Sequence, residues 1–153
     1  MSEPTARRPA FPGYGISEDS DGMLPWAWAD RRLIAAHNYW VATASVERGP
    51  HSTPVWGLWR DRTFIFSCGP ESRKARDLEA DARLVVHLES GDDVVTVEGS
   101  AERFEPTPEV LAAYGEKYGP VDPEIGIWYV VQPRRAFAWQ EATFPRSPTR
   151  FDF

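Results

Sequence analysis

The stretch His51–Gly99, HSTPVWGLWRDRTFIFSCGPESRKARDLEADARLVVHLESGDDVVTVEG, decides the fold of this chain. Within it, residues 64–68 predict a strand, Gly69-Pro70 a turn and residues 71–80 a short helix. The helix begins Ser72-Arg73-Lys74-Ala75-Arg76, although the partial positive charge of a helix N-terminus favours Asp or Glu there. A basic first turn becomes favourable when an anion binds at this point.

The start of this helix has the groups that suit a phosphate. Free backbone N–H groups, a serine hydroxyl and several cationic side chains can converge on one anion. The alternative is a solvated helix face, on which Arg73 pairs with Asp77 four residues later for a gain of about 0.2–0.5 kcal/mol. Spacing alone leaves both interpretations open. The phosphate hypothesis assigns the anion to Ser72, Arg73, Lys74 and Arg76.

Length, charge and composition indicate one globular domain. The chain has 153 residues, of which 42% are hydrophobic, enough for a core. A net charge of −6 argues against nucleic acid or an anionic membrane as the main partner. The single cysteine excludes an internal disulfide, and neither a signal peptide nor an apolar run of about 18 residues is apparent. We therefore expect a cytoplasmic protein.

The ends of the chain differ in composition from its middle. Residues 1–22 are rich in Pro, Gly, Ser and Asp without a period, and we expect a flexible N-terminal arm there. Residues 23–153 form the predicted domain, which opens with an amphipathic helix after Pro25. Residues 141–153 are expected to be an aromatic-ended tail.

Strand patterns dominate the domain. A second helix is expected over Pro108–Tyr118 with Thr107 as its N-cap. Pro54 predicts a sheet edge or a bulge, and Gly99 predicts a bulge or sharp bend. With turn-length connections, the pattern favours a mainly β fold with flanking α, a six-stranded antiparallel barrel. The six predicted strands cover residues 39–46, 51–59, 63–68, 83–89, 93–104 and 128–140, the last with a break at Pro133.

Four phrases in the chain are similar to those of a known superfamily. Over roughly residues 24–153 the sequence resembles the pyridoxamine 5′-phosphate oxidase-like split β-barrel proteins, which bind FMN or a deazaflavin. The phrases YWVAT, PVWG and HLESGDDVV are most similar to the actinobacterial branch that uses coenzyme F420. The resemblance rests on residues 39–43, residues 50–57, Ser72–Arg76 and Val97-Glu98-Gly99.

The resemblance implies an FMN-binding split-barrel fold, a homodimer and a set of cofactor-binding residues. The cofactor phosphate would be held at the turn that starts with Ser72, and Ser67 and Cys68 would lie near the ribityl chain. Trp139 and Arg150 would complete the site across the dimer interface. The flavin or deazaflavin ring would lie along the second strand, on His51, Thr53, Pro54, Val55 and Trp56.

The chain also departs from the oxidase pattern. Cys68 stands where the oxidases usually have Thr, Val94 stands near their ring-contacting Gln, and STPVWG replaces an Arg-rich strand. These differences favour F420-dependent hydride transfer to a small unsaturated molecule over pyridoxamine phosphate oxidation. No residue has the pattern of a dedicated acid or base, which fits chemistry supplied by a cofactor.

Two further hypotheses remain open at this stage. One is the same barrel with FMN as an oxidase or reductase. The other is a non-catalytic protein that binds a cofactor or haem, with His37, His51 or His87 as the axial ligand. The three histidines have no paired spacing, so a metal site held by protein residues alone is not predicted.

Overall fold

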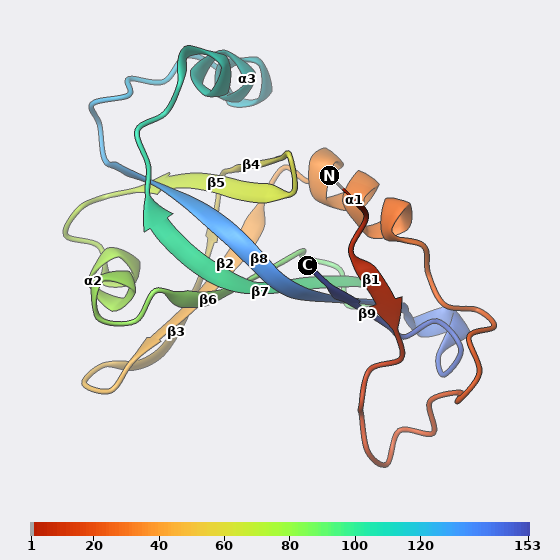
Figure 1. The fold of residues 1–153 in the computed structure, drawn as a ribbon. Coiled ribbons are helices and arrows are strands. Elements are labelled where there is room, and N and C mark those ends of the chain that lie inside the picture. Colours follow the sequence, from red (N-terminus) through yellow and green to blue (C-terminus); the bar gives the residue numbers. More distant parts are fainter. Residues whose placement is uncertain (1) are drawn as a thin grey trace.

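A computed structural model describes residues 2–153 and contains one curved antiparallel sheet with three α-helices around it (Figure 1). Residues 2–153 contain nine strands instead of the six expected, so the predicted strand count is wrong. The elements are β1 (Thr5–Arg7), α1 (Trp26–Ala35), β2 (Tyr39–Ser45), β3 (Gly49–Val55), β4 (Leu58–Arg60), β5 (Thr63–Cys68), α2 (Arg73–Ala80), β6 (Arg83–His87), β7 (Asp93–Arg103), α3 (Pro108–Tyr118), β8 (Ile127–Gln140), the 3₁₀ turn η1 (Glu141–Thr143) and β9 (Thr149–Asp152).

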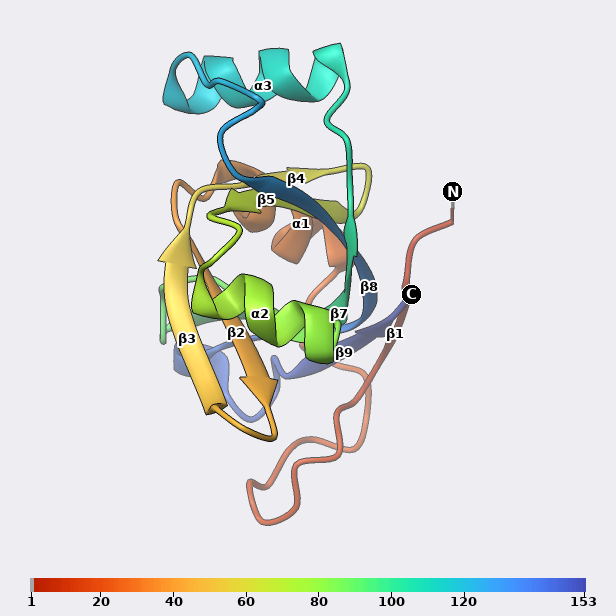
Figure 2. The same ribbon diagram turned by 90° about the vertical axis from the view of Figure 1, so that its left-hand side faces the viewer.

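The sheet has the order β1-β9-β8-β7-β6-β2-β3, and the β4–β5 pair joins it through β5 and β8. The sheet is curled, and α2 lies in front of β2 and beside β3 (Figure 2). Figure 1 shows β6 continuing from α2 into the sheet. Within residues 2–153 no ladder joins β3 to β5; β3 pairs with β2, and β4 pairs with β5. Trp56-Gly57 breaks the predicted strand 51–59 into β3 and β4.

The long strand β8 holds the sheet together. It pairs with β7 through residues 129–140, with β5 through residues 127–131 and with β9 through residues 135–138. The predicted break at Pro133 is instead a bulge inside one continuous strand. The ladder shifts register between Glu98 and Gly99, where Gly99 faces Pro133, so the bulge predicted at Gly99 is confirmed. A Cβ on Gly99 would lie 2.4 Å from the carbonyl oxygen of Gln132, which explains the glycine.

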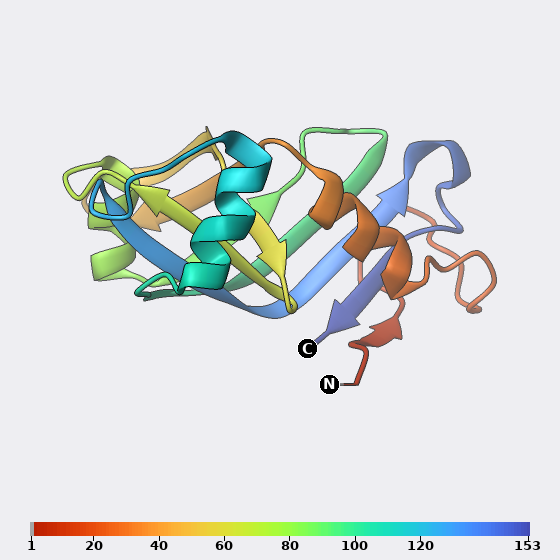
Figure 3. The ribbon, with the colours of Figure 1, turned by 90° about the horizontal axis from the view of Figure 1, so that it is seen from above.

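Both ends of the chain carry short strands that the sequence did not predict. β1 pairs with β9, and the two termini lie close together (Figure 3). The Arg8 guanidinium donates to the carbonyl oxygens of Asp19, Asp21, Arg146 and Pro148, which joins the N-terminal segment to the C-terminal loop. The segment expected to be a flexible arm therefore contributes a strand; its residue 1 lies outside the described residues. The expected C-terminal tail contributes η1 and β9.

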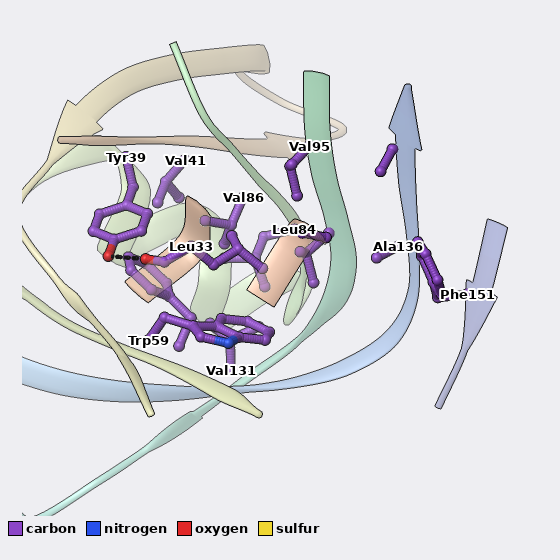
Figure 4. Close-up of a cluster of buried hydrophobic side chains, with 14 of the residues drawn as sticks. Leu33, Tyr39, Val41, Trp59, Leu84, Val86, Val95, Val131, Ala136 and Phe151 are labelled. Atoms are coloured by element: carbon purple, nitrogen blue, oxygen red, sulfur yellow. Dashed lines mark hydrogen bonds between the residues drawn. The ribbon is translucent and has the colours of Figure 1, made fainter. Parts of the chain in front are cut away.

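The main core lies inside the curl of the sheet (Figure 4). Aromatic and β-branched side chains from β2, β5, β6, β7 and β8 meet Leu33 of α1 there. The Tyr39 hydroxyl in this core donates to the Leu33 carbonyl oxygen at 2.5 Å, so the buried hydroxyl is satisfied. A second cluster places Val110 and Tyr114 of α3 against Leu58, Ile65 and Trp128, and α3 crosses over β4 and β5 in Figure 3.

Candidate functional site

β3 is the edge strand at one end of the sheet, as Pro54 predicted. Pro54 pairs with Trp40, and directly paired residues of an antiparallel ladder share a face. His51, Thr53 and Val55 pair with Thr43, Val41 and Tyr39, which are buried. The three half-buried β3 side chains therefore face the inside of the curl, whereas Ser52 and Pro54 are exposed.

Three predicted cofactor-binding residues carry buried polar atoms without a hydrogen-bond partner in residues 2–153. They are His51 Nδ1, Thr53 Oγ1 and Arg73 Nε. Buried polar groups are nearly always satisfied, so these atoms are candidates for contact with a ligand. Tyr129, Arg135 and Asp152 carry atoms of the same kind in the described residues. The Arg73 terminal nitrogen donates to the carbonyl oxygens of Arg48 and Pro50, which flank the start of β3. The structure thus brings the start of α2 and the inner face of β3 together.

Ser72 is the N-cap of α2, and its hydroxyl accepts from the Ala75 N–H at 3.3 Å. No acidic residue lies in the first turn, and Lys74 forms no hydrogen bond or ion pair within residues 2–153. Burial raises the pKa of the Cys68 thiol, partly offset by a hydrogen bond from Ser72 and the charge of Lys74. Ser72, Lys74 and Cys68 are therefore neighbours.

The alternative of a surface pair between Arg73 and Asp77 is wrong. Asp77 is fully buried, and its carboxylate accepts from Arg48 Nε at 2.8 Å and from the Thr43 hydroxyl at 2.9 Å. Burial alone would raise the pKa of Asp77, but the hydrogen bonds from Arg48 and Thr43 outweigh it and lower the pKa below its usual value. Asp77 is therefore an ionised carboxylate inside the protein.

The sequence patterns gave no role to Thr43 or Arg48, and they singled out Asp77 only as a surface partner of Arg73. One signal was present: Asp77 lies between Ala75 and Leu78, which form the buried side of α2. A carboxylate beside the apolar side of a helix requires a buried partner. That partner comes from the β2–β3 turn, and no local spacing connects it with α2.

Four predicted residues, Ser67, Trp56, Trp139 and Arg150, lie away from the region where α2 meets β3, and Arg76 lies on α2 with its side chain exposed. Arg76 lines an open groove of about 1090 Å³ beside the β2–β3 turn. Ser67 faces the opposite side of β5 from Cys68, because neighbouring strand residues alternate. Trp56, Trp139 and Arg150 contact other parts of the molecule.

Trp56 is half-exposed and stacks on Tyr118 of α3, with ring centroids 4.7 Å apart and an angle of 8° between the planes. Trp56 directly follows β3, at the opposite end of the strand from Arg48 and Pro50, which Arg73 contacts. β3 has seven residues, which span roughly 23 Å at about 3.3 Å per residue. A ligand held at both ends would have to lie along the whole strand.

Trp139 and Arg150 lie on the outer face of the sheet. Trp139 pairs with Val94 and contacts Phe11 of the N-terminal segment, with ring centroids 5.9 Å apart. Arg150 pairs with Asp152, whose oxygen lies 2.6 Å from a terminal nitrogen of the guanidinium. Within one chain these two residues do not join the residues around α2. A shared site across a dimer interface stays a prediction.

The three histidines are separate from one another. His37 contacts the rings of Trp56 and Tyr118, His87 stacks on Trp40, and His51 faces the inside of the curl. No group of three or more His, Cys, Asp or Glu side chains in the described part of the chain could hold a metal ion. None of the helices described is long and apolar enough to cross a membrane.

Residues 29–140 match the family described as pyridoxamine 5′-phosphate oxidase. The chain belongs to this family. The family binds flavins and includes oxidoreductases, so the resemblance noted in the sequence is confirmed. No curated protein matches the chain.

Solved structures share the fold at low sequence identity. A conserved hypothetical protein, Rv2991 from Mycobacterium tuberculosis, is 24% identical with a TM-score of 0.68, over 81% of this chain and 89% of that one. A protein described as an F420 reductase is 19% identical with a TM-score of 0.59, over 70% and 94%. HutZ, the haem storage protein of Vibrio cholerae, is 16% identical with a TM-score of 0.58, over 74% and 90%.

Proposed function

We propose that this protein is a cytoplasmic F420-dependent oxidoreductase that transfers a hydride between the reduced deazaflavin and a small unsaturated substrate. The observation that carries the proposal is the group of unsatisfied buried atoms on His51, Thr53 and Arg73 beside the basic start of α2. These atoms lie where a phosphate-bearing cofactor of this family was expected. A protein described as an F420 reductase shares the fold, which supports the choice of the deazaflavin.

The residues present suit such a cofactor. The first-turn N–H groups of α2, the Ser72 hydroxyl and the Lys74 ammonium would hold the phosphate. Arg73 also has a structural role, because its terminal nitrogen donates to the carbonyl oxygens of Arg48 and Pro50. Its Nε has no hydrogen-bond partner within residues 2–153 and could donate to the cofactor. The inner side chains of β3 would contact the rest of the cofactor. The bound cofactor would supply the hydride chemistry, and the protein would supply position and exclusion of water.

A homodimer with shared sites is part of this proposal. The outer sheet face carries half-buried aromatic side chains, including Trp40, Phe137 and Trp139, next to Arg150. These residues cannot join the α2 region of their own chain, so a second copy would have to bring them there. Sedimentation velocity at micromolar concentration tests this part, and a monomer would contradict it.

The first experiment is a tryptophan-fluorescence titration of the full chain with F420 and, separately, with FMN. We expect saturation by F420 and weaker binding of FMN. Lys74→Ala should weaken F420 binding about tenfold or more, because a charge-assisted contact to a phosphate contributes about 1.5–3 kcal/mol. Arg31→Ala, which removes an exposed cation from α1, is the matched control and should bind as the wild type does.

Each other outcome points to a different function. Preference for FMN would make the protein a flavin-dependent member of the family. Equal binding by the wild type and Lys74→Ala would reject the phosphate assignment. Binding of neither cofactor, together with a Soret band on titration with haemin, would favour the haem-binding alternative with His51 as the ligand to test first.

A further inference from the structure

We infer that Asp77 is a positioning residue that holds the phosphate-binding start of α2 in register with the inner face of β3. This inference rests on the proposed function, because it concerns the same site. Asp77 would not touch the ligand. It would act through Arg48 and Thr43, the two side chains that donate to its carboxylate.

Two contacts, one turn apart on α2, join the helix to the same β2–β3 turn. Asp77 accepts from the Arg48 side chain, and Arg73, four residues earlier, donates to the Arg48 main-chain carbonyl. Residues four apart lie on the same side of a helix. Arg48 is therefore hydrogen-bonded to successive turns of α2, once through its side chain and once through its main chain. The two contacts fix the rotation of α2 about its axis and its position along that axis relative to the β2–β3 turn.

The network also connects to the unsatisfied atoms of β3. Thr43, which donates to Asp77, is the ladder partner of His51. The carbonyl of Pro50, the residue before His51, accepts from Arg73. Any shift of α2 along the sheet would thus separate Arg73 and Lys74 from His51 and Thr53. These four side chains can contact the same ligand only if α2 keeps its position relative to β3.

A charged network is an unusual way to attach a short helix. Well-packed apolar side chains of similar volume often stabilise a fold as much as a buried ion pair does. A directional carboxylate, however, fixes orientation as well as distance, since it accepts from two donors with defined geometry. Alignment of the binding groups therefore explains Asp77 better than stability alone does.

The test compares cofactors that have the phosphate with the same ring systems without it. The full-length wild type, Asp77→Asn and Asp81→Asn are each titrated with FMN and riboflavin, and with F420 and its phosphate-free chromophore. Asp81→Asn is the matched control, because Asp81 lies at the other end of α2 in an exposed pair with Arg83. In Asp77→Asn we expect the preference for the phosphate-bearing form to fall about tenfold or more, the effect that supporting hydrogen-bond partners have in other sites.

A general loss of fold would weaken binding of both forms and leave their ratio unchanged, so the ratio reports alignment. An unchanged ratio in Asp77→Asn, with circular dichroism as in the wild type, would overturn the inference while the proposed function stands. A wild type with no preference for the phosphate would reject the proposed function, and the inference with it. If Asp77→Asn does not fold, Asp77→Asn/Arg48→Met removes both charges together, and an unchanged ratio in that variant would overturn the inference equally.

Discussion

Removing either partner of the Arg48–Asp77 ion pair should destabilise the protein, but not equally. The Asp77 side chain is 0% exposed, whereas the Arg48 side chain is 30% exposed. In Arg48→Met the Asp77 carboxylate stays buried without its counter-ion, which costs about 3–5 kcal/mol. In Asp77→Asn the Arg48 guanidinium can turn toward water and the amide can still accept from Thr43. That loss should be about 1.5–3 kcal/mol, the contribution of a hydrogen bond to a charged group.

Urea unfolding of the wild type, both single variants and the double variant at pH 7 measures these values. The double variant should be more stable than the sum of the two losses predicts, by about 0.5–3 kcal/mol, because removing both charges leaves none unpaired. Additive losses, or an Arg48→Met loss no larger than that of Asp77→Asn, would refute the reasoning. Arg83→Met is the control, since Arg83 forms an exposed pair, and it should change the free energy of unfolding by less than about 1 kcal/mol.

The pH dependence has a defined sign. The pKa of Asp77 is lower in the folded protein than its ordinary value of 3.8, so folding favours the ionised form. The stability that Asp77 contributes is complete above about pH 4 and is lost as the pH falls through its folded pKa. In Arg48→Met the buried carboxyl loses the group that lowers its pKa, so that pKa rises. The stability difference between the wild type and Arg48→Met should therefore be largest at neutral and higher pH, and it should shrink as the pH falls through the raised pKa of the variant and on below about pH 4.

Three further predictions concern other parts of the molecule. Arg8→Ala removes the side chain that donates to four carbonyl oxygens, so hydrogen exchange and proteolysis of residues 9–22 should increase while the core amides stay protected. Gly99→Ala places a Cβ 2.4 Å from the Gln132 carbonyl oxygen and should cost about 1–3 kcal/mol in urea unfolding, whereas Gly69→Ala meets no neighbour. Burial lowers the pKa of Lys117 to about 8 from 10.5. The unfolded chain then binds more protons between these values, and the wild type should gain stability relative to Lys117→Met as the pH rises from 8 to 10.

Local patterns predicted most of the elements correctly. Runs rich in β-branched and aromatic residues between turns indicated β2, β5, β6 and β7, and Pro108 after Thr107 indicated α3 with its N-cap, which the structure confirms. Pro54 indicated a sheet edge and Gly99 a bulge, because each restricts what the backbone can do at that position. Short sequence segments at residues 39–43, 50–57, 72–76 and 97–99 already indicated the family.

The errors occurred where distant segments meet. β1 and β9 are short and have no alternation strong enough to detect, and they are strands because they pair with each other and with β8. Trp56-Gly57 divides a predicted strand because Gly57 sits against Phe64, where an added Cβ would lie 2.4 Å from the ring. Neither effect has a signature in neighbouring residues.

For the site, the sequence by itself determined the chemistry: a basic helix start after a strand, next to an edge strand with His51 and Thr53. Only the tertiary structure decided which of those groups meet. It placed Trp139 and Arg150 on the other face of the sheet, and it paired Asp77 with Arg48, 29 residues away, instead of with Arg73. The physical reason is that burial and hydrogen-bond satisfaction depend on contacts between segments far apart in the chain, whereas helix starts, turns and bulges depend on neighbouring residues.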